Sequence, residues 1–370
     1  MAQATPKVID ADGHLIEDVA AIEQRMPEPY RARAKGPLFN LFPSLDHQHN
    51  SSLHIYPAGS LERPAVPGWR KFLTDTGISA TVLYPTMGLA NGWIVSRDWS
   101  IDVSRAYNDW VHETYVAADM RFQAMGILPV QDPDAAAAEL RHIVKDLGMP
   151  GGVLPSNGVH PNLGDRSYWP LYKEADRLGA AIAVHGASYR GWGLDNLHPF
   201  AGVHALGHPF GLLLAFTGMV FNGIPDKFPN ARFGFLEAGV SWLLVALERF
   251  DRSYSTHVQV DLRNQFLKLA KGQTVQEYVQ RHIDDGRIFV GCEGMEIMLP
   301  DAVRILGNKP FMFSTDFPHE VNTQMCMHEM SEILEHPRLA AADKAAIVGG
   351  NARRFYKIAI ATARARGKVA

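Results

Sequence analysis

Residues 169–185 read WPLYKEADRLGAAIAVH, and this stretch decides the fold. Its first part, 169–178, has a helical pattern that stops at Gly179, the residue type that most often follows the last turn of a helix. An apolar run, 180–184, follows immediately, and a comparable run, 152–155, precedes the helix. The sequence therefore predicts a strand–helix–strand unit whose two strands are parallel and buried.

The same pattern recurs along the whole chain. The apolar runs show little alternation, which is typical of strands buried on both faces of a parallel sheet. They cover 8–12, 80–84, 124–128, 152–155, 180–184, 231–236, 287–290 and 311–313. Further helical patterns cover 135–147, 240–250 and 343–358. Eight strands that alternate with helices predict a (β/α)8 TIM barrel, with residues 1–370 forming one domain. A doubly wound open sheet is the alternative, but no GxGxxG or GxxxxGK[ST] motif follows any strand run.

Three insertions account for the length beyond a minimal barrel. Residues 19–70, after the first strand, are rich in Pro, Arg and His, and residues 186–210, after the fifth strand, are rich in Gly, His and aromatic residues. Residues 253–286 have a helical pattern. In a barrel the first two insertions project from the C-terminal rim, where active sites are built.

The composition excludes several classes of protein. The chain has 370 residues, 46% hydrophobic and 20% charged, which is enough apolar material for a large core and rules out a disordered or fibrous chain. A net charge of −3 with scattered charges predicts no binding to nucleic acid or to an anionic membrane. The two cysteines, Cys292 and Cys326, form no CxxC pair. Without a secretory signal pattern, and with a longest apolar stretch (211–224) too short to span a bilayer, the sequence predicts a soluble cytoplasmic protein.

Polar side chains gather where three of the predicted strands end. The first strand ends in Asp12-Gly13-His14, the fifth in His185, and the eighth in Ser314-Thr315-Asp316. Residues i and i+2 of a strand point to the same side, so Asp12 and His14 can converge on one ion. Two imidazoles and two carboxylates suit Zn, Mn or Fe, and such an ion can lower the pKa of a bound water to about 7. Asp316 is then in place to accept the proton.

Each of these residues also has a structural interpretation. A lone Asp-x-His is common, a His at a strand end can serve packing, and Asp316 before Phe317-Pro318 can form a turn or a helix cap. Their joint placement at strands one, five and eight favours the metal site.

Several blocks of sequence, taken in order, resemble the signatures of one family. They are Ile9-Asp10-Ala11-Asp12-Gly13-His14, Ala183-Val184-His185, Phe235-Leu236-Glu237-Ala238-Gly239, Ser314-Thr315-Asp316-Phe317-Pro318-His319 and the ending Gly350-Asn351-Ala352-Arg353-Arg354-Phe355-Tyr356. Together they resemble the amidohydrolase-2 branch of the amidohydrolase superfamily, which is related to aminocarboxymuconate semialdehyde decarboxylase. The resemblance covers nearly the whole chain apart from the insertions.

The resemblance implies a TIM barrel that holds one divalent metal, Zn or Mn. Carried over residue by residue, the family's ligands are Asp12, His14, His185 and Asp316. The family contains nonoxidative decarboxylases of small, often aromatic, carboxylic acids, together with hydrolases and hydratases of related ring-cleavage products.

The end of the sixth strand departs from this family pattern. The decarboxylases usually carry a His there, followed by glycines, whereas this chain has Glu237 before Ala238-Gly239. A buried Glu can act as a general acid, bind the metal, or orient a ligand histidine. Glu237 can also simply match the dipole at a helix N-terminus. The departure favours metal-assisted hydrolysis over decarboxylation.

Other candidates lie near the predicted mouth of the barrel. Arg190 and Trp192 can clamp a carboxylate and stack on a ring, or can be exposed loop residues. Tyr84 can hydrogen-bond to substrate or pack, and His319 can lie near Asp316 and bind substrate. One of three loop histidines can reach the site, although the last of them, before Pro209, also suits a helix entry; they are His198, His204 and His208. Glu293 and Glu296 can line the mouth or face solvent, and Cys292 lacks a basic partner that would make it a nucleophile.

The leading hypothesis is a metal-dependent hydrolase acting on a small carboxylated substrate, with Asp316 as general base and Glu237 as acid or orienting partner. A nonoxidative metal-dependent decarboxylase is the alternative enzyme. A barrel without catalysis that serves as a scaffold is the alternative outside enzymes, and nothing in the sequence favours it. The resemblance also implies a homo-oligomer, and we expect a dimer.

Overall fold

Eight parallel strands form the centre of the molecule, in the order in which they occur along the chain. The computed structural model describes residues 6–32, 40–45, 58–59, 62–257 and 260–358. Every predicted strand is present, and the bounds are β1 Ile9–Leu15, β2 Ala80–Pro85, β3 Phe122–Ile127, β4 Gly151–Pro155, β5 Ala181–His185, β6 Arg232–Leu236, β7 Ile288–Cys292 and β8 Phe311–Phe313. Each strand pairs in parallel with the next, from β1 to β8.

The sheet closes into a barrel just beyond the end of β8. The backbone N–H of Asp316 donates to the carbonyl of Asp12 (2.9 Å), and the N–H of His14 donates to the carbonyl of Phe317 (2.7 Å). These bonds join the two edge strands, so the predicted TIM barrel is confirmed, in nearly closed form. Barrel closure is therefore made by the same segments that carry the predicted ligands.

The strands are buried along both faces, as their unbroken apolar runs predicted. In β5 and β7 every residue is buried, including the polar His185. One face packs against the surrounding helices and the other fills the barrel interior, which explains why the strands lack alternation.

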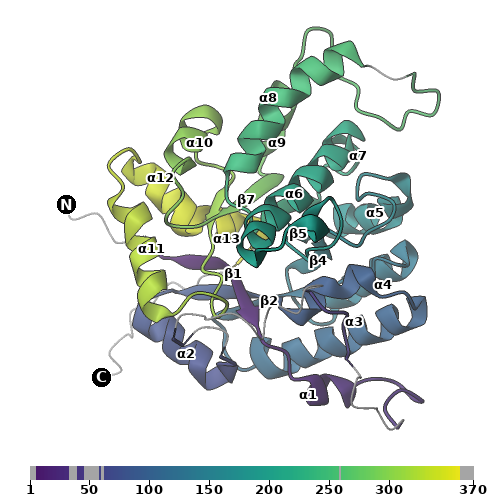
Figure 1. The fold of residues 1–370 in the computed structure, drawn as a ribbon, viewed down its shortest axis with the longest axis vertical. Helices are drawn as coiled ribbons and strands as arrows, with labels where there is room; N and C mark the ends of the chain where they lie inside the picture. Colours follow the sequence, from purple (N-terminus) through teal and green to yellow (C-terminus); the bar gives the residue numbers. More distant parts are fainter. Residues whose placement is uncertain (1–5, 33–39, 46–57, 60–61, 258–259, 359–370) are drawn as a thin grey trace, which may run out of the picture.

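Helices surround the strands (Figure 1). The α-helices are α1 Val19–Glu23, α2 Ala65–Thr76, α3 Arg97–Val111, α4 Pro133–Lys145, α5 Trp169–Leu178, α6 Phe200–Phe221, α7 Ile224–Lys227, α8 Ser241–Thr256, α9 Val275–Asp284, α10 Leu299–Leu306, α11 Thr323–Glu335, α12 Ala341–Ala345 and α13 Asn351–Tyr356. Short 3₁₀ segments are η2 Met87–Trp93, η4 Arg166–Tyr168 and η5 Leu194–Asn196, and π turns are η3 His112–Val116 and η6 Ala346–Gly350.

The predicted helix ends follow local chemistry. Helix α5 has the predicted bounds and stops at Gly179, whose φ of 57° is left-handed. Helix α4 begins at Pro133 after Asp132, whose carboxylate caps the first turn. The predicted helix 343–358 is a run from α12 through the π turn η6 to α13, and it ends two residues early because Lys357 is left-handed.

The predicted insertions need corrected boundaries. The excursion after β1 is present, but its predicted range, 19–70, includes the start of α2, and its parts 33–39, 46–57 and 60–61 lie outside the described residues. The range 186–210 begins as loop but includes the first half of α6. In 253–286 the helical prediction is right for the end of α8 and for α9, and wrong for the described residues 260–274 between them. Figure 1 shows α8 and the segment after it projecting beyond the other helices.

Helix α6 corrects the prediction made for the apolar stretch 211–224. The helix has 22 residues and is, by length and composition alone, the one helix in the described part of the chain that could cross a membrane (mean hydropathy 1.4). Half of that apolar window is buried within the molecule, where α6 packs on α8 and β5. The apolar character of α6 is therefore that of a helix covering a barrel.

Candidate metal centre

The structure brings together the four residues that the sequence predicts as metal ligands. Nε2 of His185 lies 3.2 Å from Oδ2 of Asp12, and Nε2 of His14 lies 3.5 Å from Oδ1 of Asp12. Nε2 of His14 is also 3.3 Å from Oδ1 of Asp316. Asp12 and both histidines are almost completely buried, and Asp316 is 16% exposed. Strands β1 and β5 and the end of β8 thus place two imidazoles and two carboxylates around one point.

Backbone carbonyls fix the tautomers of the two histidines. Nδ1 of His14 lies 3.0 Å from the carbonyl of Pro85, and Nδ1 of His185 lies 2.7 Å from the carbonyl of Gly186. Because a carbonyl can only accept, both Nδ1 atoms donate, and both Nε2 atoms keep their lone pairs. This is the arrangement in which His binds a metal through Nε2.

One buried atom at this point, Nε2 of His14, has no hydrogen-bond partner among the described residues. Buried polar atoms are rarely left unpaired, and an imidazole nitrogen that keeps its lone pair is of the kind that binds Zn or Mn. Burial lowers the pKa of His14 well below its usual value and so favours the neutral ligand form. The residues present fit a divalent ion.

Gly13 lies in β1 between the predicted ligands Asp12 and His14, where the neighbouring side chains leave no room for a Cβ. A Cβ at this position would lie 2.6 Å from the ring of Trp69 and 2.7 Å from Oδ2 of Asp10. Since real Cβ atoms do not approach so closely, any larger residue would displace the strand or its neighbours.

Asp10 is a site residue for which the sequence analysis assigned no role. Its buried carboxylate accepts from the Thr81 hydroxyl (2.6 Å), the Thr315 N–H (2.9 Å) and the Asp12 N–H (3.2 Å). Burial raises the pKa of Asp10 to about 7. Asp10 therefore ties β1 to β2 and to the segment after β8, directly below the ligands. A register shift in β1 between Asp10 and Gly13 turns the Asp10 carboxylate to the side of Gly13, which the simple alternation of a strand does not predict.

Glu237 faces the metal centre. Its Oε2 lies 3.1 Å from Nδ1 of His185 and has no hydrogen-bond partner among the described residues, although it is buried. Burial, followed by the charges of Asp316 and Asp12, raises the pKa of Glu237 well above its usual value. The helix-dipole interpretation does not hold, because Glu296 is the carboxylate that accepts from the Val240 N–H (2.7 Å), at the start of α8. Residue 237 also has a φ of 60°, which turns the chain sharply at the end of β6.

His319 contacts Asp316, as the sequence suggested. Its Nδ1 lies 2.8 Å from Oδ1 of Asp316, its Nε2 lies 2.9 Å from the Thr86 hydroxyl, and its ring stacks on His14 at 4.0 Å. Both ring nitrogens thus have protein partners, which favours an orienting role for His319 over the substrate-binding role expected from the sequence.

A cavity of about 380 Å³ opens at this end of the barrel. It is lined by Glu237 and Asp316 and by two of the three loop histidines, His204 and His208, whereas His198 is exposed and is not in the lining. His208 lies in the middle of α6, so its interpretation as a helix-entry residue is wrong. Its Nδ1 lies 3.0 Å from the Glu237 carbonyl, and its ring stacks on Tyr189.

Two other acidic residues and a cysteine adjoin this cavity. Glu293 is part of the lining and is exposed to solvent. Glu296 accepts from the Glu293 N–H as well as from Val240, so it orders the loop after β7. Burial raises the pKa of the Cys292 thiol well above its usual value, which agrees with the expectation that it is no nucleophile.

The remaining sequence candidates do not line the cavity. The Arg190 guanidinium lies over the ring of Trp93, 5.4 Å from its centre. Trp192 is 41% exposed and has a φ of 57° on the same loop. Tyr84 is fully buried and its hydroxyl lies 2.7 Å from that of Tyr356, so its packing interpretation fits better than substrate binding.

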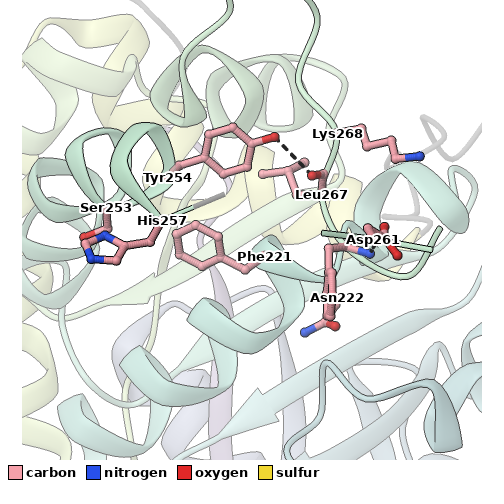
Figure 2. A pocket seen from close by; sticks show the side chains of 9 residues that line it. Phe221, Asn222, Ser253, Tyr254, His257, Asp261, Leu267 and Lys268 are labelled. Carbon is pink, nitrogen blue, oxygen red and sulfur yellow. Dashed lines mark hydrogen bonds between the residues drawn. The ribbon is translucent and has the colours of Figure 1, made fainter. Parts of the chain in front are cut away.

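A second hollow, of about 490 Å³, lies away from the strand ends, between the ends of α6 and α8 and the segment 261–268 (Figure 2). Phe221 and Tyr254 form much of its wall, and the Tyr254 hydroxyl donates to the Leu267 carbonyl (3.1 Å). His257, Asp261 and Lys268 also line it, but no group of metal-binding side chains converges there among the described residues. We assign it no part in the candidate site.

Comparisons with known proteins identify the family of this chain. The family model described as amidohydrolase matches residues 9–358. A 2-amino-3-carboxymuconate-6-semialdehyde decarboxylase from Dictyostelium discoideum is 25% identical over 71% of this chain and 68% of its own length. A gamma-resorcylate decarboxylase from Rhizobium radiobacter is 26% identical over 72% of this chain and 79% of its own.

A solved structure shares the fold. It is a dihydroxybenzoic acid decarboxylase from Polaromonas sp. JS666 with bound manganese and the inhibitor 2-nitroresorcinol. The TM-score is 0.63 at 18% identity, over 95% of this chain and 97% of that chain. The relatives are named as decarboxylases, so the comparisons favour the alternative reaction over the hydrolysis that the sequence analysis put first.

Proposed function

Because this chain belongs to the amidohydrolase family, we propose that it is a metal-dependent, nonoxidative decarboxylase of a small aromatic carboxylic acid. The observation that carries the proposal is the convergence of Asp12, His14, His185 and Asp316 beside a cavity large enough for one substituted ring. The names of the curated relatives support decarboxylation, and the manganese of the structural relative supports Mn, with Zn as the other metal that suits these ligands.

The four ligands would hold the ion through Nε2 of each histidine and through the two carboxylates. A divalent ion bound there supplies positive charge that orients the substrate's carboxylate and an adjacent oxygen. His319 and Asp10 would position the metal ligands without binding the ion. Nδ1 of His319 contacts Oδ1 of Asp316, and the Asp10 carboxylate accepts from the backbone N–H of Asp12 in β1. Both keep the ligands in place without contacting substrate.

Decarboxylation needs a proton at the carbon that loses the carboxylate. The carbon–carboxylate bond breaks, carbon dioxide leaves, and the vacated carbon ends with one hydrogen. We assign the proton to the protonated carboxyl of Glu237, whose Oε2 is unpartnered and lies at the edge of the metal centre and the cavity. After the transfer Glu237 is a carboxylate, and solvent returns its proton. Glu237 would thus replace the His that the family resemblance leads one to expect.

Metal-assisted hydrolysis is the second candidate, and the same residue favours it. A Glu at the end of β6 can accept a proton from water as well as donate one to carbon. The two reactions differ in their products: decarboxylation releases carbon dioxide without net addition of water, whereas hydrolysis adds one water to the products.

The test uses manganese-loaded protein, a panel of hydroxybenzoates that includes gamma-resorcylate, and D₂O as solvent. We expect carbon dioxide in equal amount to the acid consumed, with one deuterium at the vacated carbon. Glu237→Gln should lower kcat by about 100-fold or more while the metal content is unchanged. His198→Gln, at an exposed position in the loop after β5 and outside the cavity lining, is the control and should keep full activity. No carbon dioxide from any acid of the panel, together with uptake of solvent oxygen when a carboxylated ester or amide is supplied, would reject decarboxylation in favour of hydrolysis.

We also propose a homodimer in the cytoplasm, as the sequence analysis predicted. Light scattering after size exclusion at micromolar concentration should give twice the chain mass of 40.9 kDa. A single peak at the mass of one chain would contradict the dimer.

A further inference from the structure

Another hollow, distinct from the one in Figure 2 and lined mainly by polar side chains, lies at the end of the barrel opposite the metal centre. It has a volume of about 790 Å³ and is lined near the starts of β6 and β7 and by the loop after α5. Four cationic side chains and two carboxylates contribute to the lining, and they are Arg177, Arg232, Arg287, Lys357, Asp176 and Asp285. Arg232 is the first residue of β6 and Glu237 follows the last, so the two sites are separated by roughly 16 Å of strand.

Arg232 is the unusual member of this group. It is only 8% exposed, and its guanidinium makes no hydrogen bond or ion pair with any of the residues that the structure describes. Its Nε is buried without a partner. A buried guanidinium stays charged and is costly unless an anion or several acceptors satisfy it.

The other cations around the hollow have hydrogen-bond partners, which Arg232 lacks among the described residues. Arg287 donates to the Asp285 carboxylate (2.6 Å), and Arg177 donates to Glu174 (2.9 Å). Lys357 has only a neutral partner, the Gly179 carbonyl (2.9 Å), among the described residues. Arg232 and Lys357 therefore have no ion-pair partner among the described residues, while of the two carboxylates in the lining Asp285 pairs with Arg287 and Asp176 accepts from the Asn230 N–H (2.6 Å).

The pKa shifts of Arg232 and Lys357 are those of cations that lack an ion-pair partner. Burial lowers the pKa of Arg232 to about 10, and no nearby carboxylate counters that effect. Burial, followed by the charge of Arg232, lowers the pKa of Lys357. Burial thus disfavours the charge of Arg232, that charge in turn disfavours protonated Lys357, and an anion between them would relieve both.

We propose that this hollow binds a phosphate or the phosphoryl group of a small molecule, held by Arg232 and Lys357. A doubly charged, four-oxygen anion matches two cations on different elements, β6 and the end of α13, and the planar fork of Arg232 suits it. A singly charged carboxylate could satisfy Arg232 but would leave Lys357 without a full counter-charge. The site is independent of the metal centre and of the reaction proposed there.

Inorganic phosphate is the probe that tests the site. Thermal unfolding and calorimetric titration are measured in phosphate and in chloride at equal ionic strength. We expect a saturable rise of Tm with phosphate that chloride does not produce. Arg232→Gln should weaken phosphate binding by about tenfold or more, since it removes a charge-assisted fork. Arg304→Gln, at a residue whose side chain is 70% exposed on α10, removes the same charge elsewhere and should leave the affinity unchanged.

Lys357→Gln keeps the test decisive if Arg232→Gln fails to fold, because Lys357 is exposed. It should also weaken phosphate binding several-fold. Equal effects of phosphate and chloride, or phosphate binding that survives both substitutions, would overturn the proposal. Tighter binding of acetate than of phosphate would overturn the assignment of the ligand class.

Discussion

Asp10→Ala should destabilise the protein by about 3 kcal/mol and loosen the metal centre. The carboxylate of Asp10 accepts three hydrogen bonds, from the Thr81 hydroxyl and the N–H groups of Thr315 and Asp12. Alanine leaves these three donors buried and unpaired, at about 1 kcal/mol each. The Asp12 and Thr315 bonds anchor the two chain segments that carry Asp12 and Asp316, so the metal affinity should fall as well.

The matched control is Asp10→Asn. An amide oxygen can accept from the two backbone N–H groups, and the amide nitrogen can donate to the Thr81 hydroxyl. Because burial raises the pKa of Asp10 to about 7, replacing the acid by a neutral amide removes little favourable charge interaction. We therefore expect Asp10→Asn to stay within about 1 kcal/mol of the wild type.

Urea unfolding measures both variants, with the slope of the transition as a check that the same surface unfolds. Metal content after dialysis gives the second result. A loss of less than about 1 kcal/mol for Asp10→Ala, or equal losses for Ala and Asn, would show that the three bonds do not tie β1 to β2 and to the segment after β8 as argued.

Three further outcomes follow from the structure. Tyr84→Phe should cost about 1 kcal/mol of stability, because the hydroxyl pairs with a buried tyrosine, while KM stays unchanged; a raised KM would restore a substrate-binding role. Gly186→Ala should lower stability by about 1–3 kcal/mol and impair turnover, since its Cβ would lie 2.6 Å from the His208 ring; wild-type urea unfolding and kinetics would contradict this. Arg121 lowers the pKa of Asp119 to about 2, so Asp119 stabilises the fold above pH 3.8 and loses this contribution as the pH falls towards 2. Asp119→Asn should therefore cost about 1 kcal/mol at pH 7 and only a small fraction of that at pH 2, by urea unfolding at each pH; an equal cost at both pH values would refute this.

The fold could be predicted because its signal is local. Buried parallel strands need apolar runs, and the turn at Gly179 needs a residue that tolerates positive φ, so both features are written in short stretches of sequence. The helix α6 was harder to delimit. Pro209 lies inside it and polar histidines occupy its first half, so the sequence there looks like a loop although packing on the barrel keeps it helical.

The candidate site was predictable where it depends on strand ends. Asp12, His14, His185 and Asp316 follow apolar runs directly, and the barrel topology brings such positions together. Contacts between distant segments were not predictable from the chain alone. Tyr84, for example, was a candidate for substrate binding, but its hydroxyl pairs with that of Tyr356 and does not line the cavity.

Long-range contacts also decide two further roles. Asp10 bridges residues 71 and 305 positions away, which no local pattern shows. Glu296, and not Glu237, accepts from the Val240 N–H at the start of α8, so Glu237 faces the metal centre.

Metal content of the dialysed protein tests the central claim most directly. Elemental mass spectrometry is applied to the wild type, to His185→Ala and to the exposed control His198→Ala. We predict about one Mn or Zn per chain in the wild type and in His198→Ala, and a loss of most of it in His185→Ala. Equal metal content in all three proteins, or none in the wild type even after manganese loading, would contradict the metal centre and the decarboxylase built on it.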